Sequence, residues 1–228
     1  MVTPGLQFIA DEFRDHLRTI TFPCVAARQA SAKQTIECYV AGHMACPHED
    51  ASILDFIYGF VDKYRDAPPG FYSSVVIFTS PQTMDEELFD QYLWQRLQSL
   101  SDLDARQYHY DKRVDPNPSS PSFSFSLKEE AFYVIGMHPG SQRKARQYPY
   151  PVLVFNPHAQ FERLREEEHF ARMQHIIRKR DMAYSGSINP MLTDFGEAPE
   201  VFQYSGRVYA SDWQCPLKIN HDQHHSST

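Results

Sequence analysis

Hydrophobic side chains recur along several stretches of the chain with the 3.6-residue period of an amphipathic helix. In the first such stretch, Ile9, Phe13 and Leu17 fall on one face, with charged residues on the other. In the last stretch, Asn156 is expected to cap the helix, with Pro157 at the first helical position, where proline is well tolerated. The pattern predicts helices over residues 5–19, 50–64, 84–105 and 157–184.

Shorter stretches rich in β-branched and aromatic residues predict β-strands. These strands span residues 34–41, 71–78, 123–126, 131–137 and 151–155, and we expect strand 71–78 to lie centrally. Residues 185–216 combine turn formers with aromatics, which favours an ordered loop packed over a site. The elements predict an α+β fold in which a single domain, residues 1–220, contains a mixed sheet of about five strands flanked by helices. Residues 221–228 are expected to form a frayed tail.

The composition narrows the classes of function. Hydrophobic residues make up 42% of the 228 residues and aromatic residues 14%, which suits a folded interior with a flat apolar cavity. The net charge of −7 disfavours a nucleic-acid partner. The chain contains neither a long apolar run nor a basic leader, so we expect a cytoplasmic protein without a membrane segment. Its four cysteines are expected to be free thiols.

Two histidines follow predicted strands, at element ends where binding sites are commonly built. His158 would fall in the first turn of helix 157–184, where the helix dipole favours the neutral imidazole that a metal requires. His138 lies between strand 131–137 and a proline, and a similar argument applies to it. From spacing alone, each is more often a structural, hydrogen-bonded histidine than a metal ligand.

Other polar residues are weaker candidates. Arg143, Lys144 and Arg146 could bind a carboxylate through charge-assisted hydrogen bonds, although a solvated basic turn is the commoner reading. Cys215 precedes a proline and could offer a thiolate to haem iron. Four residues of the zinc-binding type occur within 11 residues, without the usual Cys-x-x-Cys pair: Cys38, His43, Cys46 and His48. Motifs typical of nucleotide hydrolysis and of serine hydrolases are absent.

The order of the motifs resembles the YqcI/YcgG family over residues 20–217. The resemblance rests on Phe22-Pro-Cys24, Leu93-Trp94, Asp115-Pro116, Phe123-Ser-Phe-Ser126, Gly136-Met-His-Pro139, Arg143 to Arg146, Leu153-Val-Phe-Asn156, Gln160-Phe-Glu162, Ile177-Arg178, Arg180-Asp181, Ser187-Ile-Asn-Pro-Met-Leu192, Gln203-Tyr-Ser-Gly-Arg207 and Trp213-Gln-Cys-Pro216. It implies a haem-dependent oxygenase, because the understood members bind b-type haem and hydroxylate a guanidine nitrogen of arginine or an arginine-like amino acid. Two alternatives stay open: a non-catalytic haem sensor or carrier, and a cofactor-free interaction protein that forms a homodimer.

The resemblance also implies roles for particular residues, because haem iron needs an axial ligand. His158 is the expected ligand and catalytic residue, His138 is the second choice, and Cys215 is the third. Arg143 and Arg146 are expected to bind the haem propionates. The oxidant is expected to be peroxide, or dioxygen with electrons from a donor protein.

A guanidino amino acid as substrate requires a carboxylate, because a planar cation is best held by paired hydrogen bonds to an anion. Asp181 and Glu162 are the candidates, although a helix-surface salt bridge and a residue complementing the helix dipole explain them equally well. Asn189, Tyr204 and Arg207 are expected to close the pocket over the substrate.

Overall fold

The computed structural model describes residues 4–166, 169–186 and 198–221, with no side-chain description for residues 164–174. The α-helices are α1 (Pro4–Arg18), α2 (Val25–Ala32), α3 (Asp50–Arg65), α4 (Glu86–Asp104), α5 (Ala159–Glu166) and α6 (His169–Ser185). The strands are β1 (Ile36–His43), β2 (Ser73–Ser80), β3 (Phe125–Leu127), β4 (Glu130–Met137) and β5 (Val152–Pro157). Short 3₁₀ turns occur at η1 (Pro47–Glu49), η2 (Lys144–Arg146) and η3 (Glu200–Gln203).

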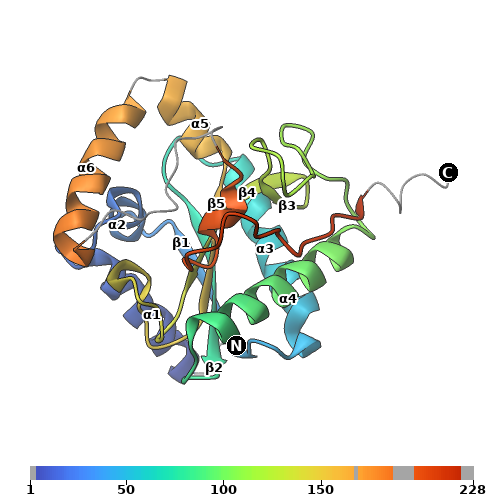
Figure 1. The fold of residues 1–228 in the computed structure, drawn as a ribbon, viewed down its shortest axis with the longest axis horizontal. Helices are drawn as coiled ribbons and strands as arrows, with labels where there is room; N and C mark the ends of the chain where they lie inside the picture. The colour runs from blue at the N-terminus through green and yellow to red at the C-terminus, as the bar shows by residue number, and fades with distance from the viewer. Residues whose placement is uncertain (1–3, 167–168, 187–197, 222–228) are drawn as a thin grey trace.

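The five strands form one mixed sheet in the order β1-β2-β5-β4-β3. Strands β1 and β2 are parallel and are connected through α3, whereas the β2–β5, β5–β4 and β4–β3 pairs are antiparallel. Helices α1, α2 and α6 lie on one side of the sheet and α3 and α4 on the other (Figure 1). The predicted α+β single domain with a five-stranded mixed sheet is confirmed.

Strand β2 shows why a continuous apolar run becomes an interior strand. Its first six residues are all buried, because helices cover both faces of the sheet. Val75 and Ile77 belong to the core under α1 and α2, and Val76 and Phe78 to the core under α3 and α4. The period-two alternation of the strand therefore divides one apolar segment between two cores.

Most predicted elements match the structure within two residues at each end. Helices 5–19, 50–64 and 84–105 correspond to α1, α3 and α4, and the five predicted strands correspond to β1–β5. Helix α2 was not predicted: its sequence, Val-Ala-Ala-Arg-Gln-Ala-Ser-Ala, contains few large apolar residues to mark a face.

The prediction for residues 156–184 was wrong in two respects. Strand β5 extends to Pro157, so Asn156 is a strand residue and not a helix cap. Its amide oxygen accepts a hydrogen bond from Ser73 Oγ at 2.7 Å and its nitrogen donates to the Tyr133 carbonyl at 3.2 Å. The single predicted helix is also two helices, α5 and α6.

The C-terminal segment, residues 198–221, packs against β4 and α4. The Gly136 amide, on β4, donates to the Tyr204 carbonyl at 2.7 Å, and Gln98 of α4 exchanges two hydrogen bonds with the Lys218 backbone. His221, expected to start a frayed tail, is instead 1% exposed, and its Nε2 lies 2.9 Å from Asp104 Oδ2. Residues 222–228 lie outside the described residues, as do residues 187–197 of the predicted loop.

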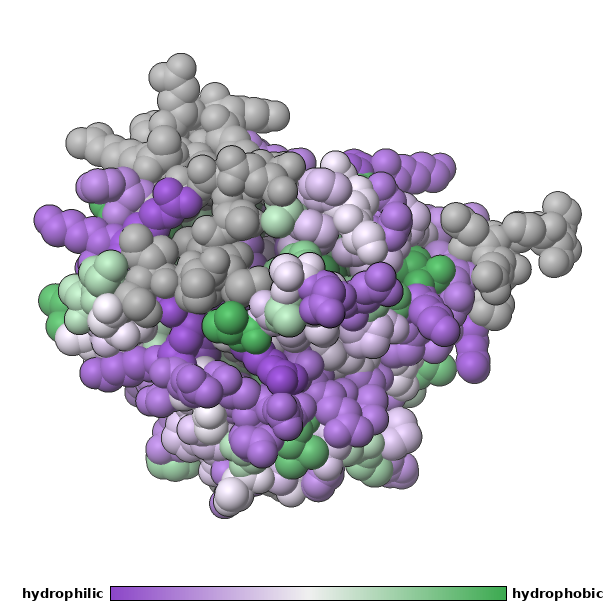
Figure 2. Space-filling view, in the orientation of Figure 1, coloured by the Kyte–Doolittle hydropathy of each residue, from purple (hydrophilic) through white to green (hydrophobic). Residues whose placement is uncertain are grey.

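Most side chains on the face drawn in Figure 2 are hydrophilic. Five large hydrophobic residues are exposed in the described part of the chain: Phe8, Ile20, Ile176, Met182 and Val208. None of the described helices has the length and hydrophobicity of a membrane-spanning segment.

Gly136 lies where strand β4 contacts α4 and the C-terminal segment. A Cβ here would lie 2.6 Å from the Phe89 ring and 2.9 Å from the Tyr204 carbonyl oxygen. We therefore expect Gly136→Ala to lower the free energy of unfolding by about 1–3 kcal/mol through overpacking. Chemical denaturation measures this change.

Gly59 provides the matched control, because it lies inside α3 and a Cβ there would meet nothing within 4 Å. Gly59→Ala should raise the free energy of unfolding by about 0.5–1 kcal/mol, as alanine loses less backbone entropy in a helix. Equal effects of the two substitutions would contradict the contacts described at Gly136.

Candidate functional site

The two candidate histidines lie at opposite ends of the β4–β5 ladder. In this antiparallel pair Phe132 is opposite Pro157, and Met137 is opposite Val152. The His158 amide donates to the Ala131 carbonyl at 2.8 Å, whereas His138 follows the other end of β4. Seven strand residues correspond to about 23 Å. The two imidazoles therefore belong to separate sites, and they cannot both contact one metal ion.

His158 lies at the junction of β5 and α5 and contacts two carboxylates. Its residue is 4% exposed, and its carbonyl accepts the first backbone hydrogen bonds of α5, from Phe161 and Glu162. Nδ1 is 3.6 Å from Glu162 Oε1, and Nε2 is 3.2 Å from Glu200 Oε1. The Glu162 side chain is 43% exposed, so the cluster extends from the protein surface to the buried Glu200.

Glu200 is a site residue that sequence reasoning missed. It is 6% exposed in η3, and its Oε2 accepts a hydrogen bond from Ser124 Oγ at 2.9 Å. The Tyr204 side chain packs near it: burial, with the Glu200 charge as the second cause, raises the pKa of Tyr204 well above its usual value. Ser124 and Glu200 are 76 residues apart in the sequence, so no local pattern could have indicated their contact.

His138 has the surroundings of a packed core histidine. It is 1% exposed, and its ring stacks on Phe89 with centroids 4.2 Å apart. Burial, together with the positive charge of Arg146, lowers the pKa of His138 to about 4. Its Nδ1 atom is buried and has no hydrogen-bond partner among the described residues. The ring is therefore neutral at neutral pH, but no carboxylate is positioned on it as Glu162 is on His158.

The two arginines expected to bind haem propionates are engaged with the protein. Arg146 is 9% exposed, and its guanidinium donates to the carbonyls of Gly136 and Gln203 at 3.0 Å each. Arg143 donates to Asp181 Oδ2 at 2.6 Å. Both arginines follow His138 in the chain, so they lie toward the end of the sheet opposite His158. The structure does not bring the predicted propionate ligands together with the predicted axial ligand.

The residues expected to bind substrate are also dispersed. Asp181 is 7% exposed and accepts hydrogen bonds from Arg143 and from Ser185 Oγ. Tyr204 is fully buried and its hydroxyl accepts a hydrogen bond from the Phe125 amide at 3.1 Å, and its expected role in closing a pocket stays a prediction. Arg207 donates to Glu87 at 2.9 Å. Asn189 lies outside the described residues.

The alternative metal ligands find no support in the described residues. No three of the described histidine, cysteine, aspartate and glutamate residues are grouped as a metal site, and this finding includes the weak zinc candidates of the sequence, Cys38, His43, Cys46 and His48. Burial raises the pKa of Cys215 to about 12, which disfavours the thiolate that iron would need. The four cysteines are free, as expected.

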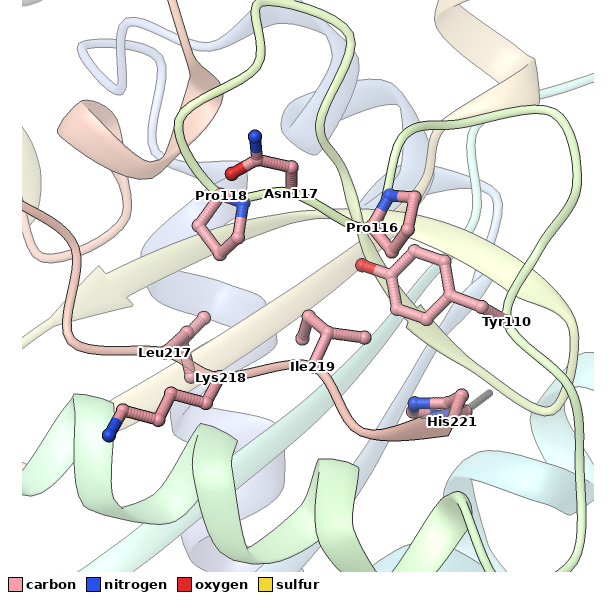
Figure 3. A pocket seen from close by; sticks show the side chains of 8 residues that line it. All are labelled: Tyr110, Pro116, Asn117, Pro118, Leu217, Lys218, Ile219 and His221. Atoms are coloured by element: carbon pink, nitrogen blue, oxygen red, sulfur yellow. The ribbon is translucent and has the colours of Figure 1, made fainter. Parts of the chain in front are cut away.

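One cavity of about 270 Å³ lies between the loop at residues 116–118 and the C-terminal segment (Figure 3). It is lined by Tyr110, Pro116, Asn117, Pro118, Leu217, Lys218, Ile219 and His221. Small-molecule pockets usually measure about 300–1,000 Å³. Neither candidate axial histidine lines this cavity, so it is not the site described above.

The fold and the His158 cluster define a mixed α/β protein in which an imidazole is held between carboxylates. The chain belongs to the YqcI/YcgG family, whose model matches residues 13–218. It is 30% identical to Bacillus subtilis (strain 168) YqcI over 186 residues, and 30% identical to YcgG of the same strain over 189 residues. Each alignment covers 77% of this chain and 71% of the relative, and both relatives are named as uncharacterized proteins. No solved structure matches the chain.

The low pKa of His138 predicts a pH dependence of stability. The folded protein holds this imidazole neutral down to a pKa of about 4, whereas the unfolded chain protonates it near 6.5. Stability is therefore present above pH 6.5 and is lost as the pH falls toward 4, by roughly 3 kcal/mol in total. Urea unfolding at a series of pH values measures the loss, and NMR titration of the His138 ring measures the pKa.

The control for this prediction is His48→Gln, because His48 is exposed in η1. This variant should keep the loss of stability at low pH, whereas His138→Leu should remove that part of it. A folded-state pKa near 6.5 for His138 would contradict the burial described here.

Proposed function

We propose that this protein is a haem b-dependent oxygenase that hydroxylates a guanidine nitrogen of arginine or an arginine-like amino acid in the cytoplasm. The observation that supports the proposal is the His158 cluster, which combines a buried imidazole with carboxylates at one strand–helix junction. An imidazole suits an axial iron ligand, and carboxylates suit a guanidinium. Membership of the family provides the remaining support, because the resemblance described above implies relatives that bind b-type haem.

The donor atoms at His158 fit haem iron better than those at His138. A metal-bound imidazole commonly has a carboxylate at its second nitrogen, which fixes the ring orientation and raises its basicity. Glu162 Oε1 lies 3.6 Å from Nδ1, and Nε2, which faces Glu200 Oε1 at 3.2 Å, would be the atom for iron. His138 has no such carboxylate and is covered by the Phe89 ring. His158 therefore remains the proposed ligand, and Glu162 is its positioning residue.

Haem b would supply the oxidising chemistry, and the protein would bind the cofactor and the substrate and orient them relative to each other. The ends of β4 and β5 fix the His158 backbone, and the buried surroundings of Glu200 exclude bulk water. With hydrogen peroxide as oxidant, one N–H bond and one peroxide give one N–OH group and one water. With dioxygen, the reaction also consumes two electrons and two protons, with the electrons coming from a donor protein.

Contact of Arg143 and Arg146 with the propionates stays a prediction, although both arginines lie toward the end of the β4–β5 ladder opposite His158, the proposed ligand. A propionate at Arg143 would compete with Asp181, and one at Arg146 would compete with backbone carbonyls of the C-terminal segment. Lost carbonyl contacts would leave buried acceptors without donors, so Arg143 is the easier of the two to engage.

Haemin titration tests the proposed ligand. The wild-type protein is expected to bind one haem and to develop a Soret band. His158→Ala should weaken haem binding by more than about tenfold, and Glu162→Gln should weaken it by about tenfold, because it removes the carboxylate that orients the ring. Absorbance titration gives the affinities.

His138→Ala is the matched control and should keep the wild-type Soret band and affinity. A protein that stays colourless with haemin, or a His158→Ala variant with an unchanged spectrum, would refute the proposal. If haem binds and mass spectrometry detects no hydroxylated product from arginine with peroxide or with dioxygen and a reductant, the protein is a haem carrier or sensor.

A further inference from the structure

Buried carboxylates in the described chain are nearly all neutralised by arginine. Asp50 is paired with Arg96, Asp90 with Arg207, Asp111 and Glu130 with Arg113, and Asp181 with Arg143. Of the buried acidic side chains, this leaves Asp104 and Glu200 without a partner among the lysine and arginine side chains that the structure describes. An arginine thus compensates the charge of most buried carboxylates, and Asp104 and Glu200 require a separate explanation.

Asp104 is explained by its hydrogen bonds. It accepts from Tyr58 Oη at 2.7 Å, from the Lys128 amide at 2.9 Å, and lies 2.9 Å from His221 Nε2. Three donors from distant parts of the chain satisfy this carboxylate and connect α3, α4 and the C-terminal segment. Asp104 therefore has a structural role.

Glu200 has less compensation. Its neighbours are the Ser124 hydroxyl, which donates to Oε2 at 2.9 Å, and His158 Nε2, 3.2 Å from Oε1. A carboxylate offers about four acceptor positions, so these neighbours leave acceptor capacity on a side chain that is only 8% exposed. A buried anion with remaining acceptors, and with no lysine or arginine beside it in the described part of the chain, is suited to receive a cation from outside the chain.

The position of Glu200 is fixed by the fold. The backbone carbonyl of Gln203, one turn later in η3, accepts a hydrogen bond from the Arg146 guanidinium at 3.0 Å, and the Gln203 side chain accepts a hydrogen bond from the Tyr133 hydroxyl. Strand β4, which carries Tyr133, thereby holds η3 in place. The Glu200 carboxylate is also in front of Nε2 of His158, the nitrogen proposed for iron.

We infer that Glu200 is the carboxylate that binds the guanidinium group of the substrate, with Ser124 as its positioning residue. The inference rests on the proposed function and replaces the two carboxylates expected from the sequence. Asp181 is already paired with Arg143, and Glu162 faces the other ring nitrogen of His158 and is 43% exposed. Two oxygens of one buried carboxylate match the parallel N–H groups of a guanidinium.

Arginine binding to the full-length protein tests the inference, by calorimetry with and without haem and by the change of the Soret band on arginine addition. Glu200→Gln keeps the shape of the side chain and removes its charge. It should weaken arginine binding by roughly 30-fold or more, since a buried charged pair is broken. Citrulline, whose side chain ends in a neutral urea, should bind the wild-type protein weakly. Its affinity should differ little between the wild type and Glu200→Gln.

Two further variants keep the test decisive. Ser124→Ala leaves the charge in place and should weaken arginine binding by less than Glu200→Gln does. Glu12→Gln changes an exposed glutamate on α1 and should bind arginine as the wild type does. Circular dichroism establishes that each variant is folded, and the Soret band of Glu200→Gln establishes that it still binds haem.

The possible failures are distinguishable. A wild-type protein without a Soret band refutes the proposed function, and calorimetry with arginine then tests Glu200 independently. A Glu200→Gln variant that binds arginine with wild-type affinity refutes the assignment of Glu200 while the haem proposal stands. A wild-type protein that does not bind arginine in either state refutes the inference.

Discussion

The guanidinium of Arg146 holds together the part of the structure on which the site depends. Strand β3 pairs with β4 over only three positions, Glu130 to Phe132, so the rest of this edge of β4 has no strand neighbour. The C-terminal segment covers it: Gly136 donates to the Tyr204 carbonyl, and Arg146 donates to carbonyls on both β4 and η3. Burial lowers the pKa of Arg146, so the backbone carbonyls must compensate the loss of hydration of this charge. The same contacts place Glu200.

The antiparallel pairing of β4 and β5 separates the regions around His138 and His158, which are close in the sequence. His138 and His158 are 20 residues apart in the chain, and both occur in the motifs that resemble the family. The turn between β4 and β5 carries them to opposite ends of the ladder. Arg143 and Asp181 join the His138 end through α6, whereas Ser124 and Glu200 join the His158 end. A cofactor at His158 must therefore be bound mainly by residues that sequence proximity does not suggest.

The sequence predicted elements well where one local pattern dominates, as in the apolar face of α1 and the continuous apolar run of β2. It failed where neighbours in space decide the outcome. Asn156 has the sequence context of a helix cap, but Ser73 and Tyr133 provide better partners for its amide within the sheet. Of the site, His158 could be found because a motif surrounds it. Glu200 could not be found, because what distinguishes it is that no described arginine pairs with it, and this property exists only in the folded protein.

The contact between His158 and Glu200 also implies a coupling between haem and substrate binding under the proposed function. Nε2 of the imidazole and Oε1 of the carboxylate lie 3.2 Å apart. The position of a metal on Nε2 is therefore adjacent to the position of a guanidinium on Oε1. A metal at Nε2 would occupy the space that faces Oε1, and a guanidinium on Oε1 would place a cation next to the same nitrogen. The two positive charges would repel each other at this distance, so each ligand should weaken the binding of the other. Linkage requires the same factor in both directions, so if arginine lowers the affinity for haem, the haem-loaded protein must bind arginine less tightly to the same extent.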